Sequence, residues 1–221
     1  MRYPNFSLER KLFQQGYQNI VGIDEVGRGA LAGPIVAVAA TITSNFQLPT
    51  FKKISNPKYQ ISKKLKIKDS KLLSEKLRES MFEELSKKVT WSIGIVTHRE
   101  IDKFGITRAN ILVIKRALRN LEIGPDYLLL DRVNGFKHKL PFELITKGDR
   151  KVLSISIASI LAKVTRDRMM REYHLKYPDY HFDRHKGYGT KLHQRCLKKH
   201  GICRIHRLSY APVRMVYNND Q

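Results

Sequence analysis

The feature that most constrains this chain is a pair of adjacent acidic residues, Asp24 and Glu25, inside an apolar stretch typical of a buried strand. Side chains alternate between the two faces of a strand, so at least one of these carboxylates points toward a packed face of the sheet. Burying an unpaired carboxylate is costly, which favours a metal ion, a cationic partner or a strand end at a cleft. The simpler alternative is an ion pair between Asp24 and Arg28 in an ordinary turn.

Glycines follow the acidic pair at Gly27, Gly29 and Gly33. The first two allow a ligand to approach the backbone closely, and Arg28 between them can meet a phosphate. Glycines after a strand also occur in dinucleotide-binding sites, but that motif needs a helix opening at the glycines and an acid about 20 residues further on. Here the chain continues into a second strand, and residues 41–48 contain no acid. We therefore exclude a dinucleotide site.

Strand and helix patterns alternate along the chain and predict the α/β class. Alternating or short apolar runs indicate strands at residues 19–26, 34–43, 90–97, 127–131 and 142–146. Helical spacing of apolar residues, with capping residues, indicates helices at 7–15, 74–88, 100–121, 152–173 and 190–200. We expect loops at 44–67 and 177–189 and an extended tail from residue 205.

Further acids stand at positions where they could join Asp24 and Glu25. Asp131 ends a strand, and Asp149 immediately precedes a helix rich in serine and alanine, where it could also be a plain N-cap. Asp167 is a competing fourth acid, although its place inside that helix favours local ion pairs. Spacing alone does not choose among these acids. Three or four carboxylates at strand ends suit hard divalent cations such as Mg²⁺ or Mn²⁺.

The charge balance points to an anionic partner. Lysine and arginine total 42 against 20 acidic residues, which gives a formal net charge of +22. Neutralising phosphates releases counterions, so nucleic acid is the first candidate; the alternative is a set of solvated basic faces. The basic residues gather mainly at 52–76, 132–151 and 184–214, which favours a broad face over a disordered tail.

Cysteine usage and hydropathy bear on the compartment. Two cysteines without a disulfide framework, no secretory signal and no apolar run of about 18–20 residues predict a soluble, cytoplasmic protein without a membrane partner. A monomer is the default expectation. One run of possible zinc ligands comprises Cys196, His200, Cys203 and His206. Its spacing matches no established zinc pattern, so we favour a basic, partly buried helix end there.

Several motifs together resemble the bacterial ribonuclease HII family, the type 2 ribonucleases H. They include Gly-Ile-Asp-Glu-Val-Gly-Arg-Gly at 22–29, Lys-Gly-Asp at 147–149 and His-Lys-Gly-Tyr-Gly-Thr at 185–190. The resemblance runs in the family's order over nearly the whole chain. Three positions depart from the family pattern: Val26 stands where alanine is usual, Ala30 where proline is usual, and Arg132 where glycine follows the third acid.

The resemblance implies an RNase H-like fold, with a mixed β-sheet flanked by helices and a C-terminal helical extension. It implies one domain over 1–221, with a core at about 17–176 and a substrate-binding extension at about 177–221. It also implies a catalytic, metal-binding set of four acids that hold Mg²⁺ or Mn²⁺. In this sequence that set is Asp24, Glu25, Asp131 and Asp149.

The resemblance further implies hydrolysis of the RNA strand of RNA–DNA hybrids. It implies incision on the 5′ side of ribonucleotides embedded in duplex DNA, leaving 3′-hydroxyl and 5′-phosphate ends. Gly27, Arg28 and Gly29 would sense the substrate, and Tyr188 the RNA–DNA junction. Discriminating RNA requires contact with a 2′-hydroxyl, which backbone groups beside these glycines can make. The candidate phosphate contacts are Arg28, Lys71, Lys163 and Lys186.

Two functions of other kinds stay open from the residues alone. One is a non-catalytic nucleic-acid-binding protein on the same scaffold, against which the presence of all four acids counts. The other is a carboxylate-metal nuclease acting on branched DNA, which would not depend on a 2′-hydroxyl.

Overall fold

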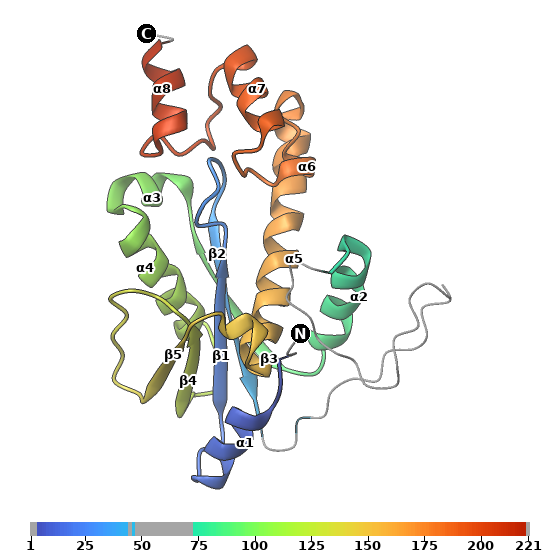
Figure 1. Cartoon of the computed structure of the whole chain (residues 1–221), viewed down its shortest axis with the longest axis vertical. Helices are drawn as coiled ribbons and strands as arrows, with labels where there is room; N and C mark the ends of the chain where they lie inside the picture. Colours follow the sequence, from blue (N-terminus) through green and yellow to red (C-terminus); the bar gives the residue numbers. More distant parts are fainter. Residues whose placement is uncertain (1–3, 44–45, 47–72, 220–221) are drawn as a thin grey trace.

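Five strands form one mixed sheet at the centre of the molecule (Figure 1). The computed structural model describes residues 4–43, 46 and 73–219. Across the sheet the strands lie in the order β3 (Thr90–Val96), β2 (Ile35–Ile42), β1 (Ile20–Val26), β4 (Tyr127–Asp131) and β5 (Phe142–Ile145). β2 runs antiparallel to β1 and β3, whereas β1, β4 and β5 run parallel to one another. The α/β class expected from the sequence is confirmed.

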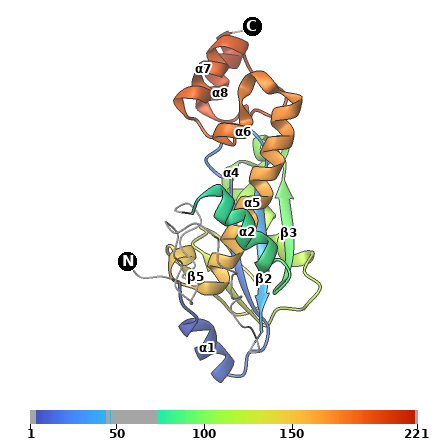
Figure 2. The ribbon, with the colours of Figure 1, turned by 90° about the vertical axis from the view of Figure 1, so that its right-hand side faces the viewer.

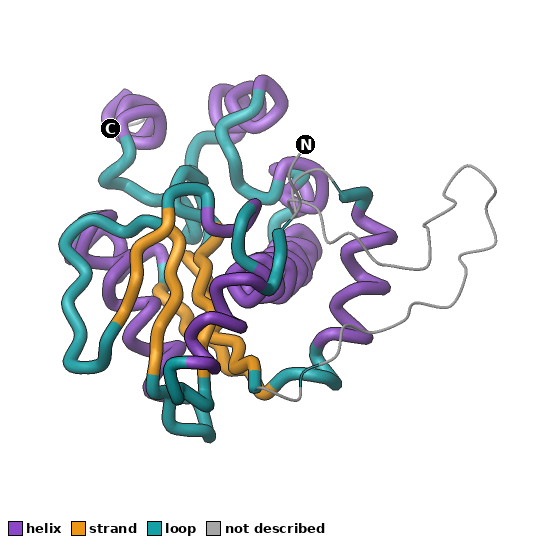
Figure 3. The backbone as a smooth tube through the Cα atoms, turned by 60° about the horizontal axis from the view of Figure 1, so that its bottom comes forward, coloured by secondary structure: helices purple, strands orange, loops and turns teal. Residues whose placement is uncertain are grey.

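Helices cover both faces of the sheet (Figure 3). One face carries α2 (Glu75–Leu85) and α5 (Leu153–Lys176), the other carries α3 (His98–Phe104) and α4 (Ile106–Arg119), and α1 (Ser7–Gln14) packs beside the start of β1. In β2, alternate residues point to opposite faces of the sheet and pack against the helices on each face. Val38 and Ala40 pack with α5, whereas Ala37 and Ala39 pack under α4.

The long helix α5 lies unusually close to β1. A Cβ atom added at Gly22 would stand 2.2 Å from the backbone carbonyl carbon of Ser154, in the first turn of α5. The small serine and alanine side chains of α5 allow this close packing on the sheet. The side chain of Glu9 in α1 accepts a hydrogen bond of 2.8 Å from the Ser154 amide, so α1 caps the start of α5. Both contacts fix α5 relative to β1.

The C-terminal part of the chain forms a helical unit at one end of the sheet (Figure 2). It contains the 3₁₀ turn η4 (Pro178–Tyr180) and the helices α6 (Phe182–His185), α7 (Lys191–His200) and α8 (Ala211–Asn219). α5 extends from the sheet into this unit (Figure 2). The turn between β1 and β2 enters it as well, with Ala30 bridged to Tyr188 and Ala32 bridged to His206.

Two fully buried arginines join this unit to the β1–β2 turn. Arg166 of α5 donates to the carbonyl oxygens of Pro34 at 2.9 Å, Lys186 at 2.9 Å and Ala32 at 3.2 Å. Arg207 donates to the carbonyl oxygen of Gly33 through two nitrogens, at 2.8 and 3.0 Å, and to that of Arg28 at 3.0 Å. Burial lowers the pKa of Arg207 to about 10, so it stays charged at neutral pH.

The structure corrects three expectations about secondary structure. The helix expected at 100–121 is two helices, because the chain turns at Gly105 with φ of +75° between α3 and α4. The loop expected at 177–189 contains η4 and α6. The tail from residue 205 is not extended, since α8 forms from Ala211 and buries Val213 against Leu31 and Leu197.

Some expectations fall outside the described residues. These include most of the loop at 44–67 and the candidate phosphate contact Lys71. In the described part of the chain, the helices are too short or too polar to cross a bilayer.

Gly22→Ala is expected to destabilise the fold by at least about 2 kcal/mol, because its methyl group would overlap the backbone of α5. Urea unfolding of the purified variant measures the change in unfolding free energy. The matched control is Gly124→Ala, an exposed glycine whose added Cβ meets no atom of the described chain within 4 Å. Equal stability of the two variants would contradict the close approach of α5 to β1.

Three histidines packed within the C-terminal unit predict a loss of stability in acid. Burial lowers the pKa of all three histidines below its ordinary value. The pKa of His193 falls to about 4 and that of His206 to about 3, and that of His185 is lowered as well. The unfolded chain, with histidine pKa values near 6.5, binds more protons, so stability falls as pH drops below about 6.5.

Thermal unfolding between pH 7 and pH 5 measures this loss. His206→Gln removes one titrating group. Between pH 7 and pH 5, its unfolding free energy should therefore decrease less than that of the wild type, by on the order of 1–2 kcal/mol. Identical pH slopes for the two proteins would show that His206 does not remain neutral in the folded state.

Candidate active site

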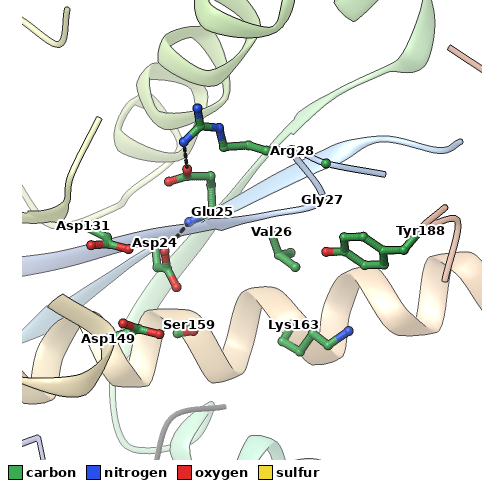
Figure 4. Close-up of a pocket in the computed structure, with 11 residues that line it drawn as sticks. Asp24, Glu25, Val26, Gly27, Arg28, Asp131, Asp149, Ser159, Lys163 and Tyr188 are labelled. Carbon is green, nitrogen blue, oxygen red and sulfur yellow. Dashed lines mark hydrogen bonds and ion pairs between the residues drawn. The ribbon is translucent and has the colours of Figure 1, made fainter. Parts of the chain in front are cut away.

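A cavity of about 500 Å³ opens where β1 and β4 end beside α5. Its wall is formed by Asp24, Glu25, Val26, Gly27, Arg28, Gly29, Asp131, Asp149, Ser159, Lys163 and Tyr188. The four predicted acids, the predicted glycine-arginine-glycine segment and the predicted tyrosine therefore meet at one place (Figure 4). They come from β1, β4, the turn before α5, and the C-terminal unit.

Strand register places the first and third acids side by side. Ile23 pairs with Leu130 across β1 and β4, and Asp24 and Asp131 each follow directly. The Asp24 side chain points toward α5 (Figure 4). It forms a hydrogen bond with Ser159 of that helix. Burial raises the pKa of Asp24 well above its ordinary value, and the negative charges of Glu25, Asp131 and Asp149 raise it further. A bound cation would relieve this repulsion.

Glu25 points to the opposite face of the sheet, toward α4, as strand alternation requires (Figure 4). It accepts a hydrogen bond of 3.1 Å from the Asn110 amide, and the Arg28 guanidinium lies 3.6 Å away. Burial raises the pKa of Glu25, while the contacts with Asn110 and Arg28 oppose the rise. The alternative ion pair between Asp24 and Arg28 is therefore wrong, because Arg28 pairs with Glu25.

Sequence reasoning missed Asn110. It lies on the buried face of α4, where its neighbours are Ala109, Val113, Ile114 and Ala117. A polar residue within this apolar stripe was the available signal. The partner that it serves, Glu25, lies 85 positions away in the chain.

Backbone amides hold the Asp131 carboxylate, and Asp149 lies in a buried turn. Asp131 accepts hydrogen bonds from the Arg132 amide at 2.9 Å and the Gly148 amide at 3.1 Å. Asp149 is buried in the 3₁₀ turn η3 (Gly148–Arg150). The N-cap alternative for Asp149 is wrong, because α5 begins later and Val152 occupies its N-cap position.

The glycine-arginine-glycine segment forms the rim of the cavity. Gly27 has φ of +97°, and a Cβ there would stand 2.3 Å from Nε of the buried Arg166. A Cβ at Gly29 would meet no described atom of the chain within 4 Å, so the space beside it is open. Across the cavity, the Tyr188 ring lies 5.8 Å from the Lys163 ammonium (Figure 4).

The predicted lysines are placed differently from one another. Lys163 lines the cavity and bonds to Asp167 at 2.7 Å, while Arg78 lies 3.9 Å from the same carboxylate. The expectation that Asp167 forms local ion pairs is confirmed. Lys186 lies outside the cavity wall, with its ammonium directed at the backbone carbonyl of Asp183.

The possible zinc ligands do not gather as one set. Cys196 is buried against Tyr180 and Phe182, whereas His206 contacts His193 at 3.0 Å. Within the described residues, no group of three or more histidine, cysteine or acidic side chains has the arrangement of a complete metal site as it stands.

Comparison with known proteins gives one family. The family model described as ribonuclease HII matches residues 21–213. Ribonuclease HII of Endomicrobium trichonymphae is 43% identical over 211 residues, which cover 94% of this chain and 92% of that protein. Ribonuclease HII of Listeria monocytogenes serotype 4b is 44% identical over 207 residues, which cover 93% of this chain and 73% of the relative.

Solved structures agree with these sequence relatives. Ribonuclease H2 from Pyrococcus horikoshii OT3 superposes with a TM-score of 0.70 at 26% identity, covering 91% of this chain and 98% of the other. Bst-RNase HIII in complex with Mn²⁺ has a TM-score of 0.67 at 17% identity, with 95% and 72% coverage, and shares the fold. The expected RNase H-like fold is confirmed, and the chain belongs to the ribonuclease HII family.

Proposed function

We propose that this protein is a divalent-metal-dependent endonuclease that hydrolyses the RNA strand of RNA–DNA hybrids. We also infer that it incises on the 5′ side of ribonucleotides embedded in duplex DNA, leaving 3′-hydroxyl and 5′-phosphate ends. The observation that carries the proposal is the meeting of Asp24, Glu25, Asp131 and Asp149 in one cavity, in a chain of the ribonuclease HII family.

The donor chemistry of the cavity fits a hard cation. Its acidic side chains supply only oxygen ligands, which Mg²⁺ and Mn²⁺ prefer. Burial raises the pKa of Asp24, and the negative charges of Glu25, Asp131 and Asp149 add to the rise, so a cation bound among them would favour the charged carboxylates. Asp24 and Asp131, adjacent on neighbouring strands, would form the centre of the set, with Glu25 and Asp149 on either side. Bst-RNase HIII, which has a related fold, was solved in complex with Mn²⁺, and this supports a divalent ion in the cavity.

The chain's residues supply alignment and charge. Divalent ions held by the four acids would supply activation of a water and charge stabilisation at the departing 3′-oxygen in an in-line displacement at phosphorus. Asp24 and Asp131 are held at their strand ends by sheet pairing, and backbone amides orient the Asp131 carboxylate. Cleavage therefore needs no nucleophilic serine or cysteine: Ser159 bonds to Asp24, and both cysteines lie outside the cavity wall.

Recognition of RNA is proposed for the rim of the cavity. The open space beside Gly29 lets a sugar approach the backbone, where a 2′-hydroxyl can donate and accept hydrogen bonds. The half-exposed Arg28 guanidinium can reach a phosphate, and the Tyr188 ring can lie against the neighbouring sugar. Lys163 adds positive charge at the same wall. We propose the same phosphate-binding role for Lys71, and the weakest one for Lys186, because its ammonium is bonded within the chain.

The domain and assembly expectations remain proposals. We infer a catalytic core at about 17–176 and a substrate-binding extension at about 177–221, since the extension supplies Tyr188 to the cavity. The two cysteines are free thiols, which fits a cytoplasmic location. A monomeric state stays a prediction.

Asp24→Asn and Asp131→Asn are expected to reduce cleavage of an RNA–DNA hybrid by at least about a thousandfold, equivalent to about 4 kcal/mol of activation free energy. Each removes a cation ligand and leaves the cationic rim intact. Hybrid affinity, measured by fluorescence anisotropy, should stay within about threefold of wild type. The exposed Glu122→Gln is the matched control and should cleave normally. Wild-type cleavage rates in either aspartate variant would refute the assignment.

Metal dependence gives a second test. Adding Mn²⁺ or Mg²⁺ should raise the melting temperature of the wild type, because a ligand that binds the folded state stabilises it. The rise should be much smaller in Asp24→Asn, and without metal this variant should melt higher than wild type, because it lacks a buried, repelled charge.

Substrate choice separates the alternatives in the same assay. A duplex with a single ribonucleotide should be cut with metal and stay intact with a chelator. Cleavage of an all-DNA branched junction would favour the branched-DNA nuclease instead, and binding without any cleavage would favour the non-catalytic protein.

A further inference from the structure

Two histidines of the C-terminal unit are buried away from the cavity and play no part in the chemistry proposed above. His193 lies on α7 and His206 in the turn before α8, with 0% and 2% of their surfaces exposed. The Phe182 ring packs edge-on against His193 with its centroid 5.6 Å away, and the Tyr180 ring lies 5.1 Å from His206. Water is thereby excluded, so the ring nitrogens must find partners within the protein.

Those partners form a continuous chain of hydrogen bonds. The Cys203 amide donates to Nδ1 of His206 at 2.8 Å. Nε2 of His206 lies 3.0 Å from Nε2 of His193, whose Nδ1 lies 3.0 Å from the carbonyl oxygen of Tyr188. This chain of hydrogen bonds ends at Tyr188, whose ring lines the cavity.

Only one pair of neutral tautomers satisfies this chain. A carbonyl oxygen only accepts, so His193 carries its proton on Nδ1 and has a lone pair on Nε2. His206 must then donate from Nε2, which leaves its Nδ1 free to accept from the Cys203 amide. The Cys203 carbonyl also lies 3.2 Å from this Nδ1, but a proton there would place two lone pairs against each other between the histidines.

The backbone of Tyr188 is also held by a bridge to Ala30 and by its own amide, which donates to the carbonyl oxygen of His185 at 2.9 Å. Gly187 and Gly189 flank Tyr188, and Gly187 has φ of +83°. The carbonyl oxygen of Tyr188 also accepts a hydrogen bond of 2.8 Å from the Thr190 amide, within the same turn. At the other end of this hydrogen-bond chain, the backbone of His206 forms a bridge with Ala32 in the β1–β2 turn.

We propose that His193 and His206 are positioning residues that fix the backbone of Tyr188 and thereby place its ring in the cavity. This inference rests on the proposed role of Tyr188 in substrate recognition. The histidines touch no reacting group and act through Tyr188 alone.

Paired variants at His193 test the proposal. His193→Phe keeps the ring volume and removes the bond to Tyr188, whereas His193→Asn keeps a donor near the position of Nδ1. On a duplex with one embedded ribonucleotide, His193→Phe should lower kcat/KM about tenfold, and His193→Asn should stay within about threefold of wild type. His200→Phe, the same change at an exposed histidine of α7, should cleave as wild type. Wild-type activity of His193→Phe would overturn the proposal.

A double-mutant cycle shows whether the effect passes through Tyr188. Tyr188→Ala should lose activity, and adding His193→Phe to it should cause no further loss. Additive losses would mean that His193 acts elsewhere, which overturns the inference. Undiminished activity of Tyr188→Ala would instead refute the proposed role of Tyr188 itself, so the two failures are distinguishable.

A measurement on the wild-type protein does not depend on any variant folding. Long-range ¹H–¹⁵N correlation spectra of the imidazoles report which nitrogen carries the proton. We expect protonated Nδ1 in His193 and protonated Nε2 in His206 at neutral pH. The opposite tautomer in either ring would overturn the proposed chain.

Discussion

Two buried guanidinium groups hold the β1–β2 turn to the C-terminal unit. Arg166 and Arg207 have no exposed surface, and their hydrogen bonds join the carbonyl oxygens of residues 28–34 to α5 and to the turn before α8. Leaving one such charge without its acceptors would cost several kcal/mol, so the β1–β2 turn and the extension must fold together. These hydrogen bonds fix the backbone conformation of the cavity rim, which includes Gly27 and Gly29.

On the acidic side of the cavity, negatively charged groups are buried close to one another. Burial and mutual repulsion raise the pKa of both Asp24 and Glu25. Because a raised folded-state pKa makes folding less favourable as pH rises through it, these carboxylates reduce stability at neutral pH until a cation neutralises them. Neighbouring groups moderate the cost: Ser159 for Asp24, and Asn110 with Arg28 for Glu25. Such concentrated, costly charge is typical of a functional site.

Much of the fold followed from local patterns. Alternating or short apolar runs predicted every strand of the described sheet, and helical spacing predicted α2, α5 and the region that α3 and α4 occupy. Errors arose where a contact outweighed the pattern. Gly105 divides a helix whose apolar spacing continues on both sides, and α8 forms because Val213 finds an apolar cluster made by Leu31 and Leu197.

The sequence by itself determined the α/β class, the adjacent carboxylates of β1 on opposite faces, and, through the family resemblance, the set of acids and the tyrosine that the cavity unites. Only the tertiary structure decided which groups support them. Asn110 reaches Glu25, the Lys186 ammonium bonds to the Asp183 carbonyl, and His206 joins His193 through one ring nitrogen and the Cys203 backbone through the other. These partners are set by strand register, helix packing and burial between segments far apart in the chain, which spacing along the sequence does not encode.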